Sequence, residues 1–86
     1  MRLFSKFRSM ENLELAIDNK ILQIAEKIKT LRREKGFRSY ETFAFEYEIN
    51  RVQYWRIEKG QNITLKTLIK VLTIHNLTLE EFFKEL

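Results

Sequence analysis

The chain has 86 residues, enough for one domain with a single core but not for two. It contains no cysteine, which excludes disulfides, thiolate zinc sites and cysteine nucleophiles and suits a reducing cytoplasm. Its formal net charge is +4, it has no proline, and its many helix-forming residues favour an all-α fold. No apolar run approaches the roughly 18 residues of a membrane-spanning helix, so we expect no membrane span.

Residues 1–10, MRLFSKFRSM, carry three basic residues and no acidic ones. Three interpretations stay open: a frayed terminus, a basic arm that touches nucleic acid, and a small amphipathic contact with a membrane surface. The segment lacks the apolar centre and the cleavage site of a signal peptide.

From about residue 12 to residue 35, apolar residues recur at three- and four-residue steps. This spacing predicts a helix with one apolar stripe, formed by Leu13, Ile17, Ile21, Ile24, Ile28 and Leu31. The stretch is either one long helix or two helices that break near Asp18–Asn19. Gly36 is a suitable end for this helix, and basic residues that favour the helix dipole stand just before it.

Four shorter helices are expected to follow, each opened by a polar N-cap. The caps are Ser39, Asn50, Thr64 and Thr78. Gln53 and Glu81 stand three residues after the second and fourth caps, as in capping boxes. Gly60 is the expected end of the helix that begins after Asn50.

The helix after Asn50 carries polar side chains on the side that its inward-facing residues, Tyr54 and Ile57, leave free. A short basic helix that follows another across a tight turn is typical of helix-turn-helix proteins, where it reads bases in the major groove. The candidate base-reading residues are Arg51, Val52, Gln53, Trp55 and Arg56.

Each of these side chains has a chemical reason to be there. Arg51 and Arg56 suit guanine O6 and N7, and Val52 suits a thymine methyl group. Gln53 either reads adenine or caps its own helix. Trp55 is costly to leave in water, so it packs on the wall of the groove or over the neighbouring loop.

Basic residues are concentrated around this helix. Residues 49–70 contain five basic residues and one acidic residue, and this excess of +4 equals that of the whole chain. Such a patch is the electrostatic footprint of a protein that binds phosphate, although a solvated helix face has the same appearance.

The segment from Ile24 to Phe83 resembles the Cro/CI-type helix-turn-helix domain, also called the XRE family, of phage repressors and many bacterial regulators. The matching stretches are IAEKIKTLRREKGF, SYETFAFEYEINRVQYWRIEKG and TLIKVLTIHNLTLEEFF, about two-thirds of the chain. The resemblance implies a compact five-helix, lambda-repressor-like helix-turn-helix bundle over residues 21–86. A basic arm and helical extension, residues 1–20, precede it.

The resemblance also implies roles for individual residues. Arg32 and Glu58 occupy the places of a partly buried ion pair that links the first helix of the family domain to the base-reading helix. Phosphate contacts are implied for Ser39, Tyr40, Lys59, Gln61, Asn62 and Lys66. Three features depart from the family: Glu48 stands where glycine is common in the turn, the loop Gly36–Ser39 is one residue longer than usual, and Tyr40 replaces the usual glutamine.

Together these features predict a sequence-specific DNA-binding transcriptional regulator that acts as a homodimer on double-stranded DNA, in the bacterial cytoplasm at the nucleoid. The alternative is a protein-interaction or antitoxin-like module that uses the same fold to bind a protein partner. We expect no enzymatic activity, cofactor or metal, since no nucleophile–base arrangement is visible and His75 has no nearby carboxylate cluster.

The family domain needs only residues from about Ile21 onward, yet the apolar stripe begins earlier. Residues 11–24 therefore either support self-association or fold back on their own domain.

Overall fold

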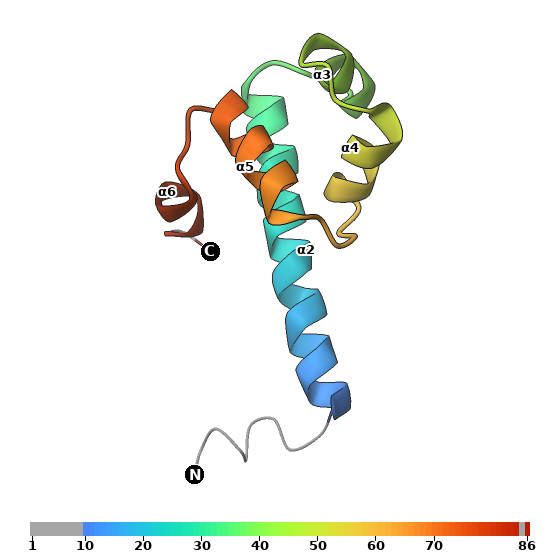
Figure 1. The fold of residues 1–86 in the computed structure, drawn as a ribbon, viewed down its shortest axis with the longest axis vertical. Helices are drawn as coiled ribbons and strands as arrows, with labels where there is room; N and C mark the ends of the chain where they lie inside the picture. Colours follow the sequence, from blue (N-terminus) through green and yellow to red (C-terminus); the bar gives the residue numbers. More distant parts are fainter. Residues whose placement is uncertain (1–9, 85) are drawn as a thin grey trace.

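The computed structural model describes residues 10–84 and 86, and this part of the chain is helical without a strand (Figure 1). The expected all-α class and the five expected helices are confirmed. The helices are α2 (Met10–Glu34), α3 (Tyr40–Glu46), α4 (Arg51–Glu58), α5 (Leu65–Ile74) and α6 (Leu79–Phe83).

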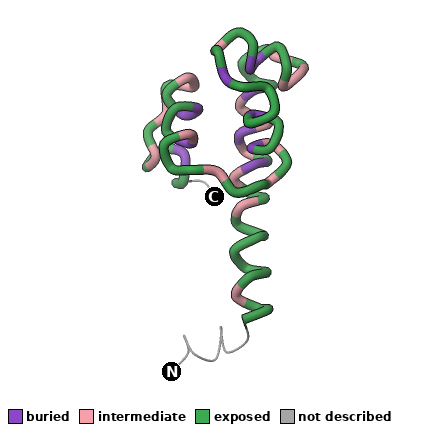
Figure 2. Tube along the Cα trace, turned by 45° about the vertical axis from the view of Figure 1, so that its right-hand side comes forward, coloured by how far each residue is buried: buried purple, intermediate pink, exposed green. Residues whose placement is uncertain are grey.

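Helix α2 is continuous, so the break considered near Asp18–Asn19 does not occur. Its buried residues, Ala25, Ile28 and Arg32, all belong to its C-terminal half. The N-terminal half runs away from the other helices instead of folding back on them, as Figures 1 and 2 show. The helix ends in the backbone hydrogen bonds of a Schellman motif, with Gly36 at a φ of +100°.

The core lies where α3, α4, α5 and α6 pack around the C-terminal half of α2. Ala44 is 1% exposed in α3, the helix that packs most closely on α4. Phe43 is fully buried, and its ring contacts those of Phe37, Tyr47, Tyr54 and His75 at centroid distances of 4.8–5.4 Å. These aromatic contacts hold the two helices of the motif as one unit.

The helix starts follow the expected caps. Ser39 and Thr64 each accept a hydrogen bond from the backbone three residues on, at 3.1 and 3.2 Å. Thr78 and Glu81 close a reciprocal capping box, whereas at α4 only the bond from the Gln53 backbone to Asn50, at 2.9 Å, is formed. The Gln53 side chain therefore does not cap its own helix.

The turn between α3 and α4 requires a left-handed residue, and Glu48 supplies it with a φ of 54°. A non-glycine residue in this conformation costs about 1 kcal/mol. The next residue, Ile49, donates its backbone N–H to Ala44 at 2.8 Å and is 7% exposed. Burial of this side chain in the core offsets the strain of the turn.

A glycine is also needed after α4. Gly60 has a φ of +79°, and a Cβ there would lie 2.6 Å from Cδ2 of Leu22. The loop from α4 to α5 thus packs directly on the back of α2.

A bidentate ion pair joins α2 to the end of α4. Arg32 donates from Nε and Nη2 to the two carboxylate oxygens of Glu58, at 2.7 and 3.0 Å. Its Nη1 donates to the backbone oxygen of Phe37 at 2.8 Å. The side chains of the pair are only 4% and 7% exposed. Glu58 raises the pKa of Arg32, and burial raises that of the neighbouring Tyr54.

We predict that Arg32→Ala lowers the free energy of unfolding by about 3–5 kcal/mol, because it leaves the Glu58 carboxylate buried without a partner. The double variant Arg32→Met with Glu58→Leu should recover much of this loss, because no charge then stays buried. Chemical denaturation of the three variants beside the wild type measures both effects. A wild-type midpoint for Arg32→Ala would contradict the prediction.

His75 gives a second prediction. Burial, aided by the charge of Lys35, lowers the pKa of His75 below its ordinary value of 6.5. The unfolded chain then binds this proton more readily, so the stability that His75 contributes is complete above about pH 6.5 and is lost as pH falls. NMR titration of the single imidazole should give a folded pKa below 6.5, and His75→Gln should flatten this part of the pH dependence. A folded pKa at or above the ordinary value refutes it.

Candidate nucleic-acid interface

Two buried residues of α4 determine which side of the helix faces the solvent. Tyr54 is 0% exposed and Ile57 is 2% exposed, so both point into the core. The candidate base-reading residues are all exposed: Arg51, Val52, Gln53, Trp55 and Arg56. They occupy the first two turns of the helix, the part that enters the major groove in helix-turn-helix proteins.

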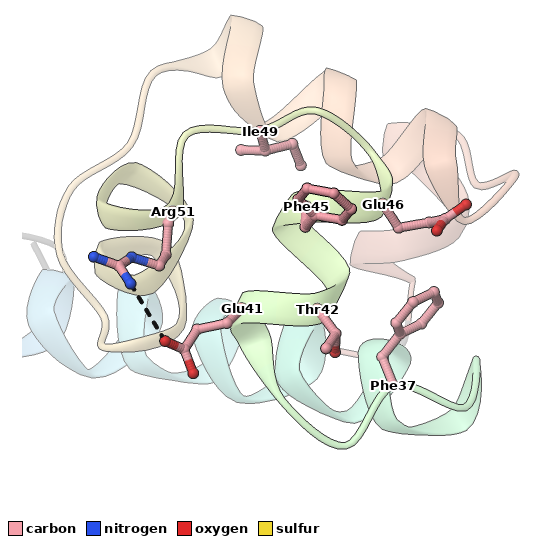
Figure 3. Close-up of a pocket in the computed structure, with 7 residues that line it drawn as sticks. All are labelled: Phe37, Glu41, Thr42, Phe45, Glu46, Ile49 and Arg51. Carbon is pink, nitrogen blue, oxygen red and sulfur yellow. Dashed lines mark hydrogen bonds and ion pairs between the residues drawn. The ribbon is translucent and has the colours of Figure 1, made fainter.

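Arg51 has a partner on α3. Its Nη1 lies 3.5 Å from Oε2 of Glu41, with side chains 66% and 53% exposed (Figure 3). An exposed pair with this geometry contributes little stability. The Arg51 guanidinium can therefore leave Glu41 for another acceptor at small cost.

Behind this pair lies a hollow of about 570 Å³ that the sequence analysis did not single out. Phe45, on α3, is 85% exposed at this hollow, and Glu41 and Glu46 line it (Figure 3). Its carboxylates disfavour phosphate. The sequence signal was present but weak: Phe45 is a large apolar residue that lies off the buried side of its helix.

A second hollow, of about 300 Å³, opens between α2, the start of α3 and α4. Trp55 is 36% exposed in its wall, and Nζ of Lys59 lies 5.7 Å from the centroid of the Trp55 ring. Trp55 lies outside the core cluster, beside Arg38 and Ser39 of the loop before α3. Ser39 and Tyr40 line the same hollow, although the Tyr40 ring also packs against the core.

This hollow, which we call the basic pocket, also contains residues that the sequence analysis missed. Lys29 and Arg38 line it together with Lys59, while the charges of Arg32 and Glu58 neutralise each other there. Three cations around a small hollow suit a phosphate group. Lys29 stands three residues before Arg32 on α2, a spacing that marks a shared helix face.

The other candidate phosphate contacts lie elsewhere. Gln61 and Asn62 line a third hollow, of about 220 Å³, between α2 and the start of α5. Lys66 is exposed in the first turn of α5. The structure thus brings Ser39, Tyr40 and Lys59 together, and it separates the remaining three from them.

None of the helices in the described part of the chain is long and apolar enough to cross a bilayer. No protein-family model and no solved structure matches this chain. Among curated proteins, the chain is 35% identical over 66 residues to "Control protein C.MunI" of Mycoplasma sp. The alignment covers 76% of this chain and 89% of that protein.

We predict that Lys29→Ala and Arg38→Ala each weaken binding to every DNA sequence alike. Each should also flatten the slope of log affinity against log salt by about 1, because each removes one phosphate contact. Filter or fluorescence titrations across a salt series measure the slope. Lys84→Ala, on the remote helix end after α6, is the matched control for loss of one charge. Slopes equal to that control would remove the basic pocket from the interface.

Proposed function

This chain belongs to the family of the control protein C.MunI, and from that premise we propose that it is a sequence-specific transcriptional regulator of the Cro/CI (XRE) class. It places α4 in the major groove of double-stranded DNA. One observation carries the proposal: Tyr54 and Ile57 anchor α4 so that a row of polar and basic side chains faces outward at its start.

Base reading falls to the side chains of α4. Arg51 and Arg56 each have the planar fork that binds guanine in the major groove, and Val52 is 49% exposed for contact with a thymine methyl group. The Gln53 side chain, which does not cap its helix, is available for adenine.

Phosphate binding falls to the basic pocket and to the loop after α4. Lys59, Lys29 and Arg38 supply charge, and the backbone at the start of α3 supplies N–H donors near Ser39 and Tyr40. Gln61, Asn62 and Lys66 extend the contact toward α5. Trp55 packs its ring on the sugar–phosphate wall between the two groups.

Two further parts of the proposal concern assembly and place. Helix-turn-helix regulators bind as dimers to half-sites roughly 34 Å apart, which brings two base-reading helices to successive major grooves. We propose that this chain does so as a homodimer. It then acts at the nucleoid in the bacterial cytoplasm, where its DNA sites are.

The alternative function, a module that binds a protein partner, is favoured by the hollow around Phe45. Glu41 and Glu46 give that hollow a negative rim, which suits an apolar side chain flanked by basic ones. Selection from a random DNA library separates the two functions. Enrichment of a near-palindromic sequence supports the regulator, whereas recovery of no sequence favours the protein-binding module.

We predict that Arg51→Ala and Arg56→Ala each weaken binding to the selected DNA site by ~1–3 kcal/mol and relax the preference for one base pair. Lys59→Ala should weaken specific and scrambled duplexes alike and reduce the salt dependence. Titrations of the three variants on both duplexes at two salt concentrations test this. Equal losses on both duplexes for all three would contradict the division between base reading and phosphate binding.

A further inference from the structure

The N-terminal half of α2 has an apolar face that its own domain leaves uncovered. Met10 and Ile17 are 68% and 50% exposed, and Figure 2 shows this part of the helix standing alone. Ile17 lies on the stripe that continues through Ile24 to the fully buried Ile28. In the C-terminal half α4 and α5 cover the stripe, and in the N-terminal half nothing in the described chain does.

The uncovered half of α2 gains no stability from packing on its own domain, whereas burial of its apolar stripe against a partner would stabilise it. We propose that a second copy of this chain covers the uncovered stripe, with the two α2 helices antiparallel. The inference deepens the homodimer part of the proposed function by naming its surface. It is measured without DNA, so it can fail while DNA reading stands.

The positions of α4 and α5 determine the orientation. Both helices lie beside the C-terminal half of α2 (Figure 1). They therefore occupy the space into which the apolar stripe continues beyond the uncovered half. A parallel partner helix would enter that space and collide with them. An antiparallel partner runs along the uncovered half, reaches only the edge of the covered half, and sends the two domains to opposite ends.

The register follows from the residue spacing of the stripe. If Ile17 meets Ile17 of the second copy, then Leu13 meets Ile21 and Met10 meets Ile24. Ile21 and Ile24 line the third hollow, of about 220 Å³, together with Ile63 and Leu65. Leu65 is 63% exposed. This apolar hollow is therefore open at the place where the Met10 and Leu13 side chains of the second copy arrive.

Charge argues against DNA as the occupant. Residues 10–21 contain three acidic residues, Glu11, Glu14 and Asp18, and one basic residue, Lys20. Phosphate is repelled by this excess of −2. In the antiparallel pair Asp18 comes near Glu14 of the second copy, which weakens the contact and offers a way to strengthen it.

The contact is small. The paired segments span about 15 residues, or roughly 22 Å of helix, which puts the interface at or below the ~800 Å² per partner of standard complexes. We expect a dimer that dissociates in the micromolar range.

Sedimentation equilibrium of the full chain over a wide concentration range tests the surface. Ile17→Glu should raise the dissociation constant at least about tenfold, because it places a charge in a desolvated apolar contact. Leu15→Glu is the matched control: it adds the same charge to the same half of α2, but on the opposite face. Circular dichroism checks that both variants keep their helix content. A monomer at all concentrations, or equal effects of the two variants, would overturn the proposal.

Two further variants test the antiparallel arrangement. Asp18→Lys should tighten the dimer, since lysine there attracts Glu14 of the second copy. The chain has no cysteine, so Met10→Cys and Ile24→Cys variants report proximity cleanly. Oxidising a mixture should give the cross-linked heterodimer in preference to either homodimer. Cross-linking of Met10→Cys mainly to itself would overturn the antiparallel arrangement.

Discussion

The bidentate pair between Arg32 and Glu58 is the contact on which the geometry of the interface depends. It joins α2 to the last residue of α4 while both side chains are nearly buried, and the same guanidinium holds the backbone of Phe37 before α3. Charges removed from water tolerate little displacement, because a lost partner leaves an unpaired charge in the interior. One arginine therefore sets the relative positions of α2, α4 and the loop that starts the helix-turn-helix motif.

The pair also determines the charge that the candidate interface presents. Because Glu58 neutralises Arg32, the positive charge of the basic pocket comes from Lys29, Arg38 and Lys59. Those three side chains are attached to α2, to the loop and to the end of α4, the same three segments that Arg32 fixes. The Arg32–Glu58 pair thus holds together the three segments that carry the positive charge of the basic pocket. Its own two charges cancel, so they contribute to the rigidity of these segments but not to the charge of the pocket.

Local signals in the sequence were sufficient to predict the helices and their caps. N-caps such as Ser39 and Thr78 accept a hydrogen bond from a residue only three positions further along the chain. They were insufficient for the basic pocket. Lys29 and Arg38 enter it only because α2 and the loop before α3 meet in space, and residue spacing within one helix does not encode that meeting. The exposure of Phe45 was not predicted either. Large apolar residues are usually buried, but the tertiary packing leaves this one exposed.

Two separate segments of the described chain carry opposite charge, and this separation lets one small domain hold two surfaces. Residues 49–70 have an excess of +4 around α4, whereas residues 10–21 have an excess of −2 along the uncovered half of α2. Phosphate attracted to the first is repelled by the second, so DNA does not compete for the apolar stripe. In the dimer that we propose, the second copy raises the local concentration of another α4, and even a weak dimer then strengthens binding to paired half-sites. Low affinity between copies is thus compatible with tight binding to DNA, because the duplex supplies the remaining contacts.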